Sequence, residues 1–368
     1  MRRYLKFAAL CLVAALALWW FGHDLPWAEV RREVGQADWR LVALATLVVC
    51  NTYVVRALRW RVLLAPLAPA ARWLDLFAAT TVGFGAIFSV GRAGEVLRPA
   101  FLPLRDERVR PSAAFVTIGV ERICDMSAVV VIFALNLLWF RAPGGDAAAY
   151  ALVRRAGLLM LGLLIVGIFA LLLLRRHAPA VTAWLDRLAT RTPRLVGRAL
   201  KIVNTIVAQL AQALGVLTDA RELLIVVGWT ALLWTIIAAA NFLVLRAFHL
   251  PFGVSETLFV LGWALVGSLV PTPGGAAGAF HLVTAAGLTF LGIAEAKSKS
   301  VSIVLHLVLF APAFFFGLYY FLRSDVSLAR LRALATAEAD AARAEAISEA
   351  HTETNAPTHA PTSVRAKA

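Results

Sequence analysis

Charged side chains stand inside one of the longest apolar stretches of this sequence. Glu121, Arg122 and Asp125 lie well inside the segment 112–140. Glu121 and Asp125 are four residues apart, so a helix projects both carboxylates from one face. An unpaired charge at the centre of a bilayer costs about 2.5–3.5 kcal/mol, so these residues must be paired or wet. We expect a polar network that balances other charges, relays a proton or ties neighbouring helices together.

A second charged group follows the apolar stretch 73–90, in the sequence GRAGEVLRP. Its charged members are Arg92, Glu95 and Arg98. A helix brings Glu95 and Arg98 onto one face, which leaves Arg92 to attract an anion. Arg92 and Arg98 are also the expected partners for the carboxylates of the first group. The alternative interpretation is a cytoplasmic loop that is rich in arginine for topological reasons.

The arginines of the segment 41–64 differ in depth. Arg56 lies further from the end of that apolar run than Arg59 and Arg61, which can extend their guanidinium groups toward the interface. We expect Arg56 to face the protein interior as a contact for a lipid headgroup.

The segment 256–291 is broken in its middle by PTPGG. The residues that break the helix are Pro271, Pro273, Gly274 and Gly275. Proline removes a backbone donor, and unwound backbone at membrane depth persists only inside protein or beside water. His281 follows where the helix resumes, and its side chain suits contact with a proton or an anion. A buried histidine with a purely structural role is the plainer alternative.

The composition is that of a membrane protein. The chain has 368 residues, of which 61% are hydrophobic and 16% charged, and this is more apolar surface than one soluble core can hide. Its net charge of +14 comes from basic residues at the ends of apolar runs, which argues against a nucleic-acid-binding module. The three cysteines lie in apolar stretches, so neither a disulfide nor a cysteine metal site is expected.

Apolar runs of about 20 residues predict membrane-spanning helices. Six runs are long enough, and the interrupted stretches 73–90 and 256–291 resemble re-entrant helical hairpins. The six runs are residues 4–21, 41–64, 112–140, 156–174, 223–248 and 301–322. The predicted fold class is therefore an all-α polytopic transmembrane bundle. The distribution of Lys and Arg among the loops places both termini on the cytoplasmic side of the cell's inner (plasma) membrane.

In that orientation each hairpin stands between two spans, and the two halves mirror one another. Inverted repeats with broken helices are typical of transporters, so we expect a central site that faces either side in turn. Three regions follow: a signal-anchor span and outer loop at 1–40, a transmembrane domain at 41–323, and a largely disordered cytoplasmic tail at 324–368. Within the second region, the basic segment 175–221 predicts a cytoplasmic amphipathic helix, which lies either on the inner leaflet or against the bundle.

No catalytic motif stands out. The sequence has no phosphate-cradling glycine loop, no HExxH or GxSxG motif and no paired cysteines. His281 and His306, the histidines inside apolar helices, lack metal-ligand spacing on one helix. We therefore expect no enzyme activity, no cofactor and no metal.

The chain resembles the lysylphosphatidylglycerol synthase transmembrane-region family, whose members are described as flippase-like. The resemblance rests on RALRWRVLL at 56–64, GRAGEVLRP at 91–99, ERICD at 121–125 and PTPGG at 271–275. It implies transfer between leaflets of an anionic or amino-acylated phospholipid, or of a polyprenyl-phosphate-linked sugar. Larger relatives add a cytoplasmic aminoacyl transferase domain, and the residues after Arg323 are too few for one. His281 stands near the position where many relatives have a carboxylate, so the headgroup can differ.

The leading hypothesis is a lipid flippase in which Arg92 and Arg98 bind a lipid phosphate and the other charged residues balance them. Its partners are membrane lipids, and a lipid-modifying enzyme is a further candidate. One alternative is a membrane enzyme that transfers a lipid-linked sugar or an acyl group, with Glu95 or Asp125 as general base. The other is a noncatalytic scaffold that docks partners through the segment 175–221 and the tail. The sequence leaves the oligomeric state open.

Overall fold

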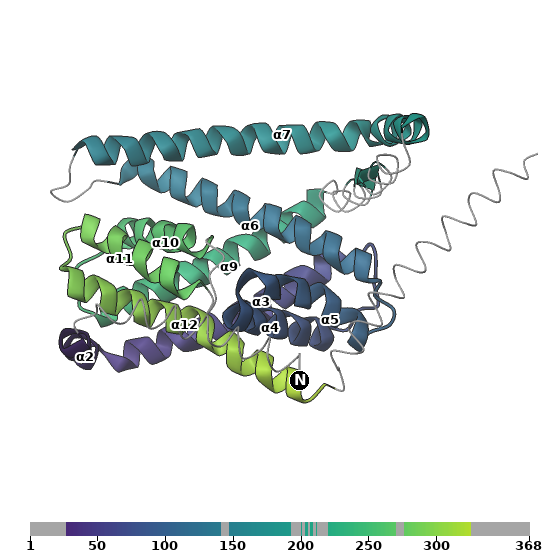
Figure 1. Ribbon diagram of the computed structural model, residues 1–368. Coiled ribbons are helices and arrows are strands. Elements are labelled where there is room, and N and C mark those ends of the chain that lie inside the picture. The colour runs from purple at the N-terminus through teal and green to yellow at the C-terminus, as the bar shows by residue number, and fades with distance from the viewer. Residues whose placement is uncertain are drawn as a thin grey trace, which may run out of the picture. The chain divides into compact units, whose positions relative to one another are not determined.

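The computed structural model describes residues 27–140, 147–192, 220–269 and 276–324, with 200, 203–204, 207–208 and 211. All regular secondary structure in these residues is helical (Figure 1). The elements are α2 (Trp27–Gly35), α3 (Trp39–Leu64), α4 (Trp73–Val90), the 3-10 helix η1 (Gly91–Val96), α5 (Leu97–Arg105), α6 (Pro111–Trp139), α7 (Ala147–Arg191), α9 (Ala220–Ala247), α10 (Val254–Ser268), α11 (Ala277–Phe290) and α12 (Glu295–Leu322). The predicted all-α polytopic fold is confirmed.

Four helices of the described chain are long and apolar enough to cross a membrane, namely Trp39–Leu64, Arg154–Arg191, Ala220–Ala247 and Glu295–Leu322. They correspond to four of the six predicted spans. The fifth, α6, has 29 residues, which is ample length, but it carries the charged group at Glu121. The sixth, at 4–21, lies outside the described residues.

The helix α7 is much longer than the predicted span. Its 45 residues run without a break to Arg191, so the expected soluble connection begins as a continuation of the helix. Residues 193–199 and 212–219 of the predicted amphipathic segment, with six residues between them, lie outside the described residues. Arginine pairs at 154–155 and 175–176 bracket 19 apolar residues, a length of about 29 Å that matches the hydrocarbon core. Between them Leu159, Leu163 and Phe169 are each more than 60% exposed, as a lipid-facing helix requires.

The first interrupted stretch folds back on itself. After α4, the η1 segment returns along the helix, and a Cβ atom on Gly94 would collide with the backbone of Ala86 and Ile87. Only glycine permits this close approach. The return directs α5 and its Arg98 into the bundle.

The second interrupted stretch forms the pair α10 and α11, which lie side by side (Figure 1). Their backbones approach closely, because a Cβ atom on Gly267 would lie 2.8 Å from the carbonyl oxygen of Ala279. The connecting residues 270–275 lie outside the described residues, and with them the predicted Pro271, Pro273, Gly274 and Gly275.

The helices pack around a common apolar core. The helix α3 lies along α9, α4 lies along α12, and α6 contacts α10 and α7. Polar bonds join two helix pairs: Tyr53 Oη of α3 donates to the Leu309 carbonyl of α12 at 3.3 Å, and Asn136 Nδ2 of α6 donates to the Ser255 carbonyl of α10 at 2.9 Å. Outside the membrane helices, Arg108 donates to Asp106 at 2.7 Å and lowers the pKa of that carboxyl.

The contact between α4 and α12 predicts a measurable effect at Gly317. A Cβ atom there would lie 2.5 Å from the Thr81 carbonyl oxygen and 3.2 Å from the Gly85 Cα, so the two helices would have to separate. We expect Gly317→Ala to destabilise the protein by about 1–3 kcal/mol, measured as a lower midpoint of thermal unfolding in detergent. Gly162→Ala is the control, because nothing lies within 4 Å of its added methyl group. Equal midpoints for both variants would contradict this packing.

Candidate functional site

A cluster of ionised side chains occupies the interior where α3, α5 and α6 meet. Two carboxylates and four guanidinium groups form it: Glu121, Asp125, Arg56, Arg59, Arg98 and Arg122. Local helix geometry prepares the contact. Arg56 and Arg59 are three residues apart on α3, and the carboxylates are four apart on α6, so each helix presents its charges on one face.

Arg59 lies at the sealed side of the cluster. Its side chain is fully buried, with Nη1 at 2.7 Å from Asp125 Oδ1 and Nη2 at 3.3 Å from Glu121 Oε1. Nη1 also donates to Thr230 Oγ1 of α9 at 3.1 Å. Arg59 thus joins three helices and holds both carboxylates. The sequence-based expectation that Arg59 could reach the interface is wrong, because the contact of α3 with α6 and α9 encloses it.

Arg98 is also enclosed. Nη1 donates to Glu121 Oε1 at 2.6 Å, and the guanidinium lies 4.2 Å from the centre of the Trp60 ring. Trp60 is itself held by a bond from Nε1 to Thr117 Oγ1 at 3.0 Å. Glu121 was one expected partner of Arg98, which η1 and α5 turn toward α6.

Arg56 and Arg122 lie on the open side of the cluster. Their side chains keep 12% and 32% of their exposure, compared with 4% for Arg98. Arg122 Nη2 lies 3.1 Å from Glu121 Oε1 and 3.6 Å from Asp125 Oδ2. Arg56 Nη1 lies 3.5 Å from Asp125 Oδ2, and its guanidinium stands 4.5 Å from the centre of the Phe84 ring.

The cluster carries more positive than negative charge. Four guanidinium groups face two carboxylates in a buried setting, where an uncompensated charge is strongly unfavourable. Several donors have no hydrogen-bond partner among the described residues, including Arg56 Nη1 and Arg122 Nε. The arrangement is therefore suited to an added anion.

A cavity of about 410 Å³ begins at this open side. Arg56, Arg122, Asp125 and Glu95 form its polar end. Its walls are almost wholly apolar and come from α4, α6, α7, α9, α10 and α12: Phe84, Ile87, Met126, Val129, Val130, Phe133, Met160, Trp234, Leu265, Val266, Leu269 and Phe310. An amphipathic cavity of this size fits a molecule with an anionic head and an apolar body.

The remaining predicted site residues lie in different places. Glu95 lies at the polar end of the cavity, near enough to Arg122 to interact electrostatically. The side chain of Arg92 lies outside the described residues. His281 is buried in α11, with its ring centre 4.8 Å from that of His306 on α12.

Sequence reasoning missed the aromatic residues of the site. Phe84 lines the cavity and stands within 6 Å of the guanidinium groups of Arg56, Arg98 and Arg122. Trp60 stands 4.2 Å from the Arg98 guanidinium. An aromatic residue in an apolar helix does not by itself indicate a functional site. The position of Trp60 beside Arg59 in the RALRWRVLL stretch could have indicated that it contacts a charged group.

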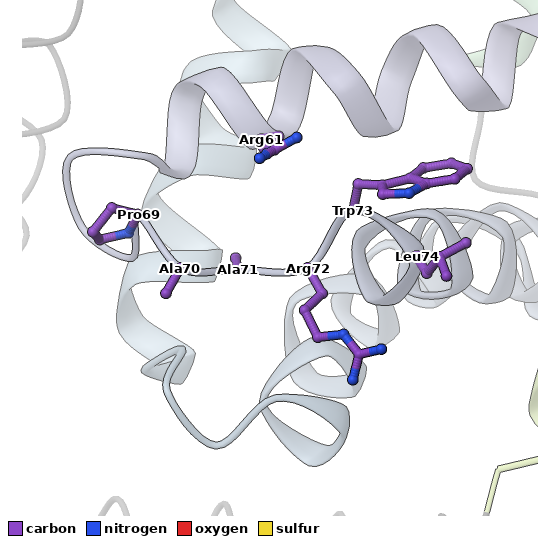
Figure 2. Close-up of a pocket in the computed structure, with 7 residues that line it drawn as sticks. All are labelled: Arg61, Pro69, Ala70, Ala71, Arg72, Trp73 and Leu74. Atoms are coloured by element: carbon purple, nitrogen blue, oxygen red, sulfur yellow. The ribbon is translucent and has the colours of Figure 1, made fainter.

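A second hollow, of about 420 Å³, lies at the connection between α3 and α4 (Figure 2). Arg61, Arg72 and Trp73 are among its lining residues. Figure 2 shows the Arg61 and Arg72 side chains on opposite sides of the connecting segment, and Arg72 is 70% exposed with Asp75 beside it at 3.9 Å. The two guanidinium groups do not converge, so we do not assign a ligand site there.

These features define a polytopic helical membrane protein with a buried ionic cluster beside an amphipathic cavity. The family model of the lysylphosphatidylglycerol synthase TM region matches residues 7–317. The chain belongs to that family, as its four motifs indicated. A comparison with curated proteins finds no significant match.

Proposed function

We propose that the protein moves a phosphate-bearing lipid between the leaflets of the membrane. The observation that carries the proposal is a buried ionic cluster with more guanidinium groups than carboxylates, two of which, Arg56 and Arg122, reach the polar end of an otherwise apolar cavity. The lipids that the resemblance implies, whether phospholipid or polyprenyl-phosphate-linked, share a phosphate and an apolar chain. The proposal rests on this shared chemistry and involves no catalytic step.

In this proposal Arg56 and Arg122 hold the phosphate. A guanidinium group can donate two parallel bonds to phosphate oxygens, and both groups already border the cavity. Arg59 and Arg98 have a different role, because they fix the carboxylates that orient Arg56 and Arg122. The earlier assignment of the phosphate to Arg98 is therefore replaced.

The lipid chain would lie along the apolar walls between α6, α7 and α10. Met126, Val130 and Met160 line this part of the cavity, and α7 is exposed along most of its length. A chain in this position can reach the surrounding lipid without crossing polar groups. We further propose that the protein resides in the cell membrane with both termini on the cytoplasmic side. A lipid-modifying enzyme would supply the transported lipid.

Filling the cavity tests the proposal. Purified protein in liposomes should accelerate the movement of a fluorescent phospholipid between leaflets, measured by quenching of the outer leaflet with dithionite. Val130→Trp should lower that rate at least about tenfold, because the indole occupies the space of the ligand. Val131→Trp is the matched control, since Val131 is 38% exposed and does not line the cavity. A wild-type rate equal to that of protein-free liposomes, or full activity of Val130→Trp, would refute it.

A further inference from the structure

A smaller cavity, of about 120 Å³, adjoins the larger one that is proposed to hold the lipid. The two cavities share lining residues from α3, α4, α9, α10 and α12: Arg56, Phe84, Trp234, Leu265, Ser268 and Phe310. Arg56 therefore borders both spaces. A phosphodiester carries one organic group on each side of its phosphorus atom. A lipid whose phosphate lies at Arg56 can thus place its acyl chains in the larger cavity and its headgroup in the smaller one.

Charge limits what the smaller cavity can accept. Arg56 lines it, and none of the described residues around it is acidic, whereas Glu95 and Asp125 line the larger cavity. The adjoining cluster already has four guanidinium groups for two carboxylates. A phosphate offsets part of this excess, but an ammonium group on the same headgroup would restore it in a buried setting. The smaller cavity therefore favours a neutral headgroup over an amine.

Aromatic rings also line the smaller cavity, and such rings can bind a cation. They belong to Tyr53, Phe84, Trp234, Phe280 and Phe310. The Phe84 ring already faces a cation, because the Arg56 guanidinium stands 4.5 Å from its centre. A contact between a cation and a ring recovers less free energy than the burial of an unpaired ion costs. These walls are better suited to the carbon atoms of a neutral group.

The polar atoms of the smaller cavity match hydroxyl groups. Thr52 Oγ1 donates to the Val49 carbonyl at 2.6 Å, and Tyr53 Oη donates to a carbonyl of α12 at 3.3 Å. Toward a ligand both oxygens therefore act as acceptors. Trp234 is 5% exposed, and its indole Nε1 donor has no hydrogen-bond partner among the described residues, which requires an explanation. A hydroxyl group can donate to the two oxygens and accept from the indole.

The volume of the smaller cavity sets a limit on size. An apolar cavity of about 150 Å³ is large enough for benzene, which has about six non-hydrogen atoms. The glycerol headgroup of a phospholipid has a similar number of atoms beyond its phosphate, and the smaller cavity is of similar volume. A hexose or an aminoacylated glycerol is far larger. The cavity therefore fits a headgroup of about the size of glycerol.

We propose that the smaller cavity is a headgroup site that selects a phospholipid with a small, neutral, hydroxylated headgroup, such as glycerol. The inference rests on the proposed function, because it takes the lipid phosphate to lie at Arg56. Trp234 donates to a headgroup oxygen, and Thr52 accepts from a headgroup hydroxyl. Aminoacylated lipids are disfavoured by charge and size, and sugar-bearing lipids by size.

Competitive lipid retention, measured by native mass spectrometry, tests the headgroup site. The protein is supplied with equal amounts of four lipids that have the same acyl chains: phosphatidylglycerol, phosphatidylpropanol, phosphatidylethanolamine and lysylphosphatidylglycerol. We expect phosphatidylglycerol to be retained about tenfold over each of the others, because phosphatidylpropanol lacks both hydroxyls and the other two carry ammonium groups. Equal retention of phosphatidylpropanol, or of either amine-bearing lipid, would overturn the proposal.

Two conservative variants locate the site. Trp234→Phe removes the indole N–H, and Thr52→Val removes the hydroxyl with little change in shape. Each should reduce the preference for phosphatidylglycerol over phosphatidylpropanol to about threefold or less. The matched controls are Trp229→Phe on α9 and Thr46→Val on α3, since neither residue lines either cavity and Thr46 bonds to its own helix as Thr52 does. An undiminished preference in both Trp234→Phe and Thr52→Val would contradict the assignment.

A diacylglycerol of the same acyl chains, added to the mixture, separates this proposal from the previous one. If the wild type retained diacylglycerol as well as every phospholipid, the phosphate site and the proposed function would both be overturned. If it preferred all four phospholipids over diacylglycerol but did not distinguish among them, headgroup selection alone would be overturned.

Discussion

Replacing Arg122 or Arg56 with glutamine is expected to slow lipid movement strongly while the protein remains folded. Each variant removes donors from the polar end of the cavity, and one charge-assisted contact to phosphate contributes about 1.5–3 kcal/mol. We therefore expect rates lower by about 10- to 100-fold for each variant in the dithionite assay. The buried positive excess is also reduced, so thermal stability should be maintained or rise.

The control for these variants is Arg246 of α9, in the stretch NFLVLRAF at 241–248 that resembles NTYVVRAL at 51–58 of α3. Arg246 matches Arg56 in sequence, but it is exposed and stands 5.2 Å from the Phe242 ring, away from the cavity. Arg246→Gln should move lipid at the wild-type rate. If Arg122→Gln and Arg246→Gln were equally active, the phosphate would have to bind elsewhere.

The second large effect is expected for Glu121→Gln, which should lower the stability of the protein and not only its transport rate. The Oε1 atom of Glu121 accepts hydrogen bonds from Arg98 at 2.6 Å and Arg122 at 3.1 Å, and it forms an ion pair with Arg59 at 3.3 Å. Glu121→Gln preserves the shape but leaves four guanidinium groups with Asp125 as their carboxylate partner in the cluster. Breaking a buried ion pair in this way costs about 3–5 kcal/mol.

Thermal unfolding followed by fluorescence-detected size exclusion measures this effect. Glu29→Gln is the control, because Glu29 is exposed on α2 and should change the midpoint little. A double variant, Arg98→Gln with Glu121→Gln, should recover part of the loss, since it also removes one unpaired charge. A midpoint for Glu121→Gln equal to that of the wild type would show that the cluster does not hold α5 and α6 together.

The sequence was sufficient to predict that the intramembrane charges form a network. A charge inside an apolar helix must be compensated, so the pairing of Glu121 with an arginine of the other group follows from energetics alone. The breaks at Gly94 and before His281 followed from residue types in the same way. The helical fold and the family assignment rest on such local signals.

The sequence could not predict which arginines face the cavity and which are enclosed by the helices. Whether an arginine faces the cavity or the sealed side depends on how α3 meets α6 and α9, and on the direction in which η1 returns along α4. For this reason Arg59 was predicted to reach the membrane interface and Arg98 to bind the lipid phosphate, whereas both side chains are enclosed in the cluster. The His281–His306 contact likewise depends on the packing of α11 against α12, which no spacing within one helix reveals.

Native mass spectrometry of the gently extracted protein is the most direct test of the central claim that Arg56 and Arg122 hold a lipid phosphate. Protein supplied with equal amounts of a phospholipid and a diacylglycerol of the same chains should retain the phospholipid. The double variant Arg56→Gln and Arg122→Gln should lose that retention, while Arg246→Gln keeps it. Equal retention of diacylglycerol by the wild type, or undiminished phospholipid retention by the double variant, would contradict the account.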